Sequence, residues 1–219
     1  MDAQTPIPQE LEKWEALFSA KAMELYPPTD PSHDYLHIRR VVAAALKLAA
    51  QEGANMNVVL PAAYFHDFVN VPKNDPRRSQ ASRLSAEAAV IYLESVGYPA
   101  QYFDDIAHAI AAHSFSAAIP CETLEAKVVQ DADRLDALGA VGIARCFSTS
   151  AFMGRPYYDI ADVLAENRDP DDGLYAIDHF FVKLFKVAEQ LQTKAAREEG
   201  ARRVAFMREY LGQLKAEAA

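Results

Sequence analysis

Apolar residues recur along this chain at spacings of three and four, which is the pattern of helices that bury one face. The pattern predicts a helix over residues 9–26 that ends at Pro27-Pro28, and a second helix over 34–52 that Gly53 closes. Further helices are expected at 58–68, from Ser82 to near Gly97, from about Pro99 through His108 and His113, and at 123–138, 141–153, 175–193 and 195–216. Residues 70–78 and 154–173 are expected to be mostly irregular. Because no segment alternates convincingly with period two, we predict an all-α fold.

Composition sets limits on the class of protein. The chain has 219 residues, 51% of them hydrophobic, which is enough for one sizeable core, and we expect a single domain over 1–219. The net charge of −9 argues against nucleic acid as a partner, because such binding relies on a basic surface. A small anion is still compatible with that charge, since a bound metal and a few local basic groups can reverse the field inside one pocket.

Neither a signal peptide nor an apolar run of roughly 20 residues is visible, so no membrane partner is expected. Cys121 and Cys146 lack the spacing of a metal or disulfide motif, and we interpret them as free thiols in a reducing compartment. These features together predict a cytoplasmic protein.

Polar residues interrupt the apolar faces of three predicted helices. His37 lies at the edge of the inward stripe of the second helix, and the nearly all-apolar helix at 58–68 ends abruptly in His66-Asp67. Adjacent helical residues point about 100° apart, so the side chains of His66 and Asp67 can coordinate one ion from two directions. Asp131 lies on the inward face of the helix at 123–138, where a carboxylate is almost never buried without a partner.

Each of these residues alone has a structural interpretation. A single inward histidine is more often a hydrogen-bonded core residue, Asp67 could simply end its helix, and Asp131 could pair with Arg40 or Arg134. Together they form a set of two imidazoles and two carboxylates. That mixed nitrogen and oxygen set suits one divalent cation, with Mn, Mg, Ni, Co, Fe and Zn all open.

The same residues resemble the HD-domain superfamily of metal-dependent phosphohydrolases. The resemblance is carried by H-x-x-R-V at 37–41, the His66-Asp67 doublet and D-A-D-R-L-D-A-L-G at 131–139. It extends through V-P-K-N-D-P at 71–76, A-S-R-L-S-A at 81–86, G-R-P-Y-Y-D at 154–159 and H-F-F-V-K-L at 179–184, which are similar to a small bacterial branch typified by YedJ and YpgQ. The core motifs occupy 33–139, and the helices at 175–216 complete the domain.

The resemblance implies a metal held by His37, His66, Asp67 and Asp131. It also implies hydrolysis of a phosphate ester or anhydride by metal-activated water, with a nucleotide as the small phosphorylated substrate. The suggested activities are nucleoside triphosphate pyrophosphohydrolase and nucleotidase. Phosphoryl transfer depends mainly on positioning and on positive charge near the phosphates.

Several further residues are candidates for the chemistry. Asp67, His113 and Arg134 are candidate catalytic groups, and Arg40, Lys73 and Arg134 are candidate substrate contacts. Each has a structural alternative: Lys73 as a solvated loop residue, Arg134 as the orienting partner of a carboxylate, Arg40 as a partner of Asp131 or Asp67, and His113 as a buried or supporting residue.

Other polar residues are expected to be secondary. Asp133 and Asp136 are interpreted as capping or pairing residues, and Glu87 is only a weak candidate base. Tyr157 and Tyr158 could stack on a nucleobase, although core or surface roles are commoner for aromatic residues. His108 and His113 are five residues apart and share a face poorly, which favours one metal over two.

Two other functional classes remain open. One is a nucleotide-binding regulator without turnover, against which the complete ligand set argues. The other is a di-iron oxygenase, which needs histidine ligands that the chain does not place convincingly. The helix at 195–216 could pack on its own core or form a homodimer.

Overall fold

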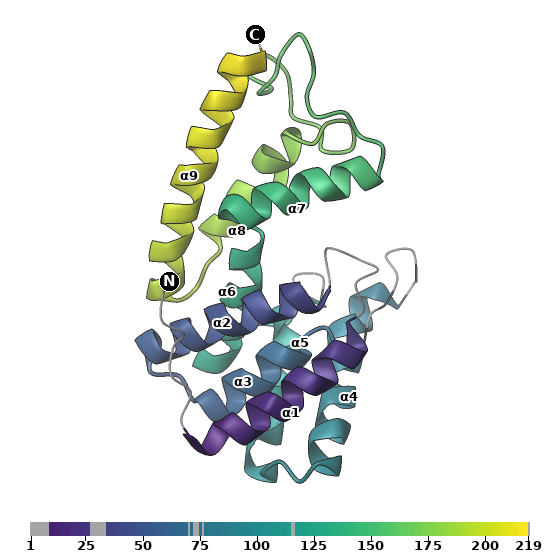
Figure 1. Ribbon diagram of the computed structural model, residues 1–219, viewed down its shortest axis with the longest axis vertical. Coiled ribbons are helices and arrows are strands. Elements are labelled where there is room, and N and C mark those ends of the chain that lie inside the picture. The colour runs from purple at the N-terminus through teal and green to yellow at the C-terminus, as the bar shows by residue number, and fades with distance from the viewer. Residues whose placement is uncertain are drawn as a thin grey trace. The chain divides into compact units, whose positions relative to one another are not determined.

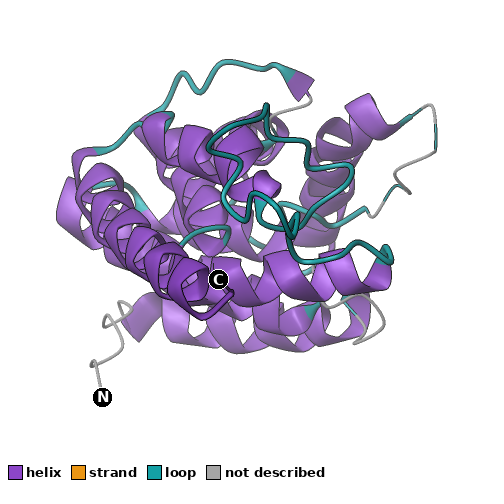
Figure 2. Ribbon diagram, turned by 90° about the horizontal axis from the view of Figure 1, so that it is seen from above, coloured by secondary structure: helices purple, strands orange, loops and turns teal. Residues whose placement is uncertain are grey.

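The structure is a computed structural model that describes residues 9–26, 34–69, 71, 75, 77–114 and 117–218. These residues group into two compact units, 1–133 and 134–219, and the division falls inside helix α6 (Leu124–Asp136). The described residues form helices and loops, with one isolated bridge between Asp159 and Asp162. Figure 2 accordingly shows helices and loops without a strand. The predicted all-α fold is confirmed, whereas the single domain stays a prediction.

The first unit begins with helices whose ends agree with the sequence signals. Helix α1 (Gln9–Leu25) is followed by α2 (Tyr35–Glu52), which the Asp34 carboxylate caps by accepting from the backbone N–H of His37 at 2.8 Å. Gly53 closes α2 in the left-handed conformation, with φ of 76°, which a residue with a Cβ adopts only under strain. The start of α2 therefore has a fixed position, and His37 lies in its first turn.

Helix α3 (Met56–Phe65) is buried along most of its length and contains Pro61, which cannot donate a backbone hydrogen bond. The carbonyl of Asn57, four residues earlier, would otherwise accept that bond. Tyr98 compensates, because its hydroxyl donates to the Asn57 carbonyl at 2.7 Å. Phe18 of α1 then packs edge-on against Phe65, with ring centroids 5.2 Å apart. These contacts hold rigidly the helix that ends at His66.

The remaining elements of the first unit pack around α3. They are the short 3-10 turn η1 (Arg78–Gln80), α4 (Ala81–Ser95), the 3-10 turn η2 (Ala100–Tyr102), α5 (Phe103–His113) and the beginning of α6. Helices α1, α2, α4 and α5 all contact α3, and α4 also lies along α5 (Figure 1). Gln130 connects α6 to the end of α5, because its side-chain amide donates to the Ala112 carbonyl at 2.8 Å.

The second unit contains α7 (Gly139–Phe152), the π-helix η4 (Phe180–Leu184), α8 (Phe185–Glu189) and α9 (Lys194–Ala218). Helix α9 packs on α7 and α8 and buries Ala196, Gly200, Met207 and Leu211. The second unit therefore has a core of its own. The homodimer that the sequence allows through this last helix stays a prediction.

One predicted helix is wrong in extent. The sequence pattern predicts a helix over 175–193, but helical structure covers only residues 178–189, which include η4 and α8. Asp178, which is fully buried, explains the late start, because its carboxylate accepts from the Arg168 guanidinium and from the Asp171 N–H of the preceding loop. Those tertiary bonds hold the residues just before 178 in turns, which helical periodicity does not reveal.

Within the part of the chain that the structure describes, none of the helices combines the length and the apolar character needed to cross a bilayer.

Candidate metal centre

The centre is built around His66, which follows the last residue of α3 and is fully buried. Its Nδ1 lies 2.9 Å from the Ala63 carbonyl. Since a carbonyl only accepts, Nδ1 must carry the hydrogen, and Nε2 is left with a lone pair. Among the residues that the structure describes, that buried Nε2 has no hydrogen-bond partner. A buried polar atom without a partner costs about 1–3 kcal/mol, so its environment needs a physical explanation.

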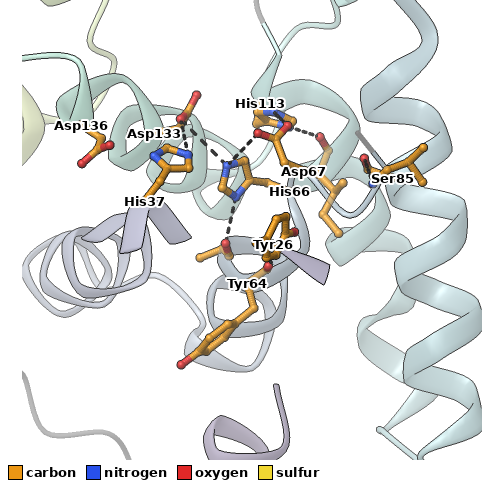
Figure 3. A network of polar contacts seen from close by, with 12 residues as sticks. Tyr26, His37, Tyr64, His66, Asp67, Ser85, His113, Asp133 and Asp136 are labelled. Atoms are coloured by element: carbon orange, nitrogen blue, oxygen red, sulfur yellow. Dashed lines mark hydrogen bonds and ion pairs between the residues drawn. The ribbon is translucent and has the colours of Figure 1, made fainter. Parts of the chain in front are cut away.

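Carboxylates surround this nitrogen at distances too long for hydrogen bonds. His66 Nε2 lies 3.7 Å from Asp67 Oδ2 and 4.0 Å from Asp133 Oδ1, and His37 Nε2 lies 3.6 Å from the same Asp133 oxygen. Figure 3 shows these side chains converging from α2, the end of α3 and α6. Separations of this size are what an ion between the donor atoms requires, whereas directly bonded groups approach within about 3.2 Å.

The turn after the doublet is fixed by Ser85 of α4. The Ser85 hydroxyl is buried and accepts from the Val69 N–H at 3.0 Å, while the Phe68 N–H donates to the Phe65 carbonyl at 3.1 Å. Both bonds hold the backbone on either side of the exit from α3. Asp67 therefore leaves the helix in a defined direction, with its side chain 32% exposed.

Asp131 does not occupy the position that the sequence predicts for it. It is fully buried, as expected, but the described groups of three ligand atoms within 4.8 Å of one another contain Asp133 and not Asp131. The two residues are about 200° apart around α6, so only one of them can face the histidines. Asp131 has polar interactions of its own. The structure thus brings Asp133, and not Asp131, beside the histidines, where Asp133 is a candidate ligand in addition to the pairing role expected of it.

His113, the last residue of α5, joins the cluster from the side of Asp67. Its Nδ1 donates to the Ile110 carbonyl at 2.6 Å, and its Nε2 lies 3.5 Å from Asp67 Oδ1. His66 and His113 therefore have the same arrangement, in which a backbone carbonyl fixes Nδ1 and Nε2 faces the carboxylates. His108 lies outside the cluster, because its Nε2 accepts from the Glu122 N–H at 3.0 Å.

Burial and charge set the protonation of the two histidines in opposite directions. Burial lowers the pKa of His66, and the neighbouring His113 and His37 add to that effect against the attraction of Asp67 and Asp133. Burial acts on His113 in the same sense, but its contact with Asp67 outweighs it and raises the pKa of His113. His66 is therefore suited to donate a lone pair, and His113 is suited to carry a proton.

The donor set fits a single cation. Two overlapping groups bring three ligand atoms together, His37-His66-Asp133 and His66-Asp67-His113, and both use His66. Only one nitrogen of His66 is available, because the Ala63 carbonyl occupies the other, and one nitrogen binds one ion. The two groups hence describe one centre, with imidazole and carboxylate donors suited to Mn, Fe, Co, Ni or Zn.

Most other candidate residues lie outside this cluster. Arg134 donates from Nη1 to the Gln190 carbonyl at 2.7 Å, which is neither of its expected contacts, and Asp136 pairs with Arg145 at 2.6 Å, as a pairing residue should. Glu87 is exposed, and Tyr157 is 56% exposed. Lys73 falls outside the described residues.

Arg40 is half-buried one turn beyond His37 and remains a candidate substrate contact. Residues that sequence reasoning missed are Asp133, as a ligand, and Ser85. The D-A-D triplet at 131–133 offers Asp133 as one of two possible ligands. Nothing in the sequence pattern marks Ser85.

An all-α unit in which a histidine–aspartate doublet lies beside a further histidine and a further aspartate has the arrangement expected of an HD-type metal centre. The HD-domain family model matches residues 34–138, which contain every residue of the centre, and the chain belongs to the HD-domain family. It is 34% identical over 193 residues to the Bacillus subtilis protein YpgQ, and the match covers 85% of this chain and 86% of that one.

Two solved structures show the same fold. The crystal structure of Bacillus subtilis YpgQ in complex with ADP matches with a TM-score of 0.74 and 32% identity, over 94% of this chain and 95% of that one. An HD-superfamily hydrolase from Bacillus thuringiensis matches with a TM-score of 0.71 and 31% identity, over 95% and 97% of the two chains. The resemblance to the HD superfamily and its YpgQ-like branch is confirmed.

Proposed function

We propose that this protein is a metal-dependent phosphohydrolase acting on a nucleotide, with His37, His66, Asp67 and Asp133 as the ligands of one divalent cation. One observation carries the proposal. The buried Nε2 of His66 has no hydrogen-bond partner and faces two carboxylates at 3.7 and 4.0 Å. A cation bound there relieves the orphaned nitrogen and the repulsion between the carboxylates. When bound, it supplies a Lewis acid for a phosphoryl oxygen and lowers the pKa of water.

The surrounding residues support this chemistry. Asp67 and Asp133 are each 32% exposed, so the open side of the centre is reached through the carboxylates, while the histidines are buried behind them. The Nε2 of His113 lies 3.5 Å from Asp67 Oδ1, and a protonated Nε2 there can donate to a leaving oxygen. Arg40 and Lys73 are the proposed contacts for substrate phosphates.

The nucleotide is proposed as substrate because YpgQ, which shares the fold, was crystallised with ADP. Nucleoside triphosphate pyrophosphohydrolysis and nucleotidase activity both fit this class. A regulator that binds nucleotides without turnover would use the same pocket, but nothing in the geometry of the centre favours it over an enzyme.

A turnover screen tests the proposal. The purified protein, with its bound metal measured, is incubated with nucleoside mono-, di- and triphosphates in the presence of Mn, Mg, Co or Ni, and released phosphate and pyrophosphate are quantified. We expect turnover of at least one nucleotide that Asp67→Ala abolishes together with the bound metal. The absence of release from every nucleotide with every metal would refute the hydrolase. Two irons per chain would favour the oxygenase instead.

A further inference from the structure

A second group of polar residues belongs entirely to the second unit, in the chain segment that connects α7 to α8. After α7 the chain reverses at Gly154, whose φ is 68°, and the Arg155 N–H donates to the Ser150 carbonyl at 2.9 Å. The following residues run beside the segment before η4. The Ala176 N–H donates to the Pro156 carbonyl at 3.1 Å, and the Ile177 N–H donates to the Tyr157 carbonyl at 2.9 Å. The backbone therefore brings Arg155 next to the residues that start η4.

The π-helix η4 places two basic residues on one side. His179 caps η4, and Lys183 follows four residues later, close to one full turn. Asp172 holds the imidazole, since the Nδ1 of His179 lies 2.8 Å from its Oδ2, which directs Nε2 away from the carboxylate. Short π-helical turns are uncommon and occur frequently at functional sites.

Positive charge gathers around this histidine. Burial lowers the pKa of His179, and Lys183 and Arg155 lower it further, against the opposing effect of Asp172. The backbone pairing of residues 156–157 with 176–177 and the four-residue step from His179 to Lys183 bring both cations into the neighbourhood of His179. In the part of the chain that the structure describes, the side chains of Arg155 and Lys183 form no ion pair and no hydrogen bond. The chain has 31 acidic residues and a net charge of −9, so two cations without a carboxylate partner are unexpected from its composition.

Like charges held together are unfavourable unless an anion offsets them. A phosphoryl group matches these groups: the arginine fork binds two of its oxygens and the lysine ammonium adds a point charge. The Nε2 of His179, which carries no hydrogen when Nδ1 donates to Asp172, accepts from a phosphate O–H. Exposure allows access, because Lys183 is exposed and the side chain of His179 is 25% exposed.

We propose that Arg155, His179 and Lys183 form a phosphoryl-binding site in the second unit, for free phosphate or pyrophosphate or for the phosphate of a nucleotide. The site uses none of the residues of the metal centre. It therefore stands or falls independently of the proposed hydrolase.

The test follows the His179 imidazole by NMR in the full chain with its metal bound, and the resonance is assigned by its loss in His179→Gln. The protein is titrated at constant ionic strength with inorganic phosphate, pyrophosphate and AMP in separate series. We expect a saturable shift of the His179 resonance with at least one of them. Saturation by phosphate or pyrophosphate identifies a free anion, and saturation by AMP alone identifies a nucleotide phosphate; both support the site.

Matched variants separate a built site from general attraction. A lost charge-assisted hydrogen bond is worth roughly 1.5–3 kcal/mol, so Lys183→Gln should raise the dissociation constant about tenfold or more, and Arg155→Gln similarly. Lys186→Gln, which removes an exposed charge from α8 just beyond η4, should leave the constant within about twofold. The proposal is overturned if no anion shifts the resonance saturably, or if Lys186→Gln weakens binding as much as Lys183→Gln. Because Lys183 is exposed, its variant should fold even if the Arg155 variant does not.

Discussion

Replacing His66 by leucine should abolish the stabilisation of this protein by metal without destabilising the metal-free form. In the metal-free protein the leucine removes the buried, unpartnered Nε2, whose burial costs about 1–3 kcal/mol. It also removes the Nδ1 hydrogen bond to the Ala63 carbonyl, worth about 1 kcal/mol. The sum predicts a free energy of unfolding in EDTA that is equal to that of the unsubstituted protein or up to about 2 kcal/mol higher.

Bound metal, in contrast, should stabilise the unsubstituted protein and not the His66→Leu variant. At a free Mn concentration about 100 times the dissociation constant, binding should stabilise the unsubstituted protein by about 2.7 kcal/mol. For a chain of this size that corresponds to a rise in Tm of roughly 5–10 °C. His66→Leu should show no such rise, because it lacks the central ligand.

Thermal unfolding in EDTA and in Mn, followed by circular dichroism, measures both quantities. His108→Leu is the matched control, since His108 binds the Glu122 N–H outside the centre and should keep the full rise in Tm. An unchanged rise in His66→Leu would refute the ligand assignment. A loss of more than about 3 kcal/mol in EDTA would show that the orphaned nitrogen is not a source of instability.

Three further predictions concern neighbouring groups. Ser85→Ala removes the acceptor of the Val69 N–H at 3.0 Å, so the turn that carries Asp67 should loosen and metal affinity, measured by calorimetry, should fall several-fold. Arg168→Met leaves the fully buried Asp178 without its two guanidinium bonds and should cost about 3 kcal/mol in urea unfolding, the low end for a broken buried pair, because the Arg168 side chain is 24% exposed. His113→Gln should keep the bound metal but reduce kcat about 100-fold or more in the nucleotide assay, as loss of a general acid does.

The first two of these predictions each have a control on the same chain. Ser95→Ala, at the exposed end of the helix that carries Ser85, should leave metal affinity unchanged. Arg202→Met breaks an ion pair in which the Arg202 side chain is 74% exposed and should cost under about 1 kcal/mol. The reasoning fails if a control matches its partner, or if His113→Gln loses the metal together with activity.

Local chemistry made much of the fold predictable. Gly53 marks the end of α2 because only a left-handed residue allows that C-cap, and the Gly97–Pro99 junction marks the end of α4 and the restart before α5. The helix expected at 175–193 was wrong because a tertiary contact, the buried Asp178 with Arg168, decides the conformation there. Such contacts between distant residues leave no trace in helical periodicity.

The candidate site shows the same limit at the level of one residue. An inward stripe identifies burial, and Asp131 is indeed fully buried. A metal centre open to substrate instead needs a carboxylate at the edge of the buried face, and Asp133 is there with its side chain 32% exposed. The D-A-D motif contains both residues. Its spacing alone cannot distinguish a buried acid that needs polar partners, as Asp131 does, from an acid at the edge that can bind an ion, as we propose for Asp133.

The central claim is therefore best tested by measuring bound metal in Asp133→Asn and Asp131→Asn, purified and dialysed in parallel. The account predicts that Asp133→Asn loses the metal and keeps its Tm in EDTA. It predicts that Asp131→Asn keeps about one ion per chain but unfolds at a lower temperature, because its fully buried carboxylate has polar interactions that the amide cannot all reproduce. Retention of metal by Asp133→Asn together with its loss from Asp131→Asn would contradict the account.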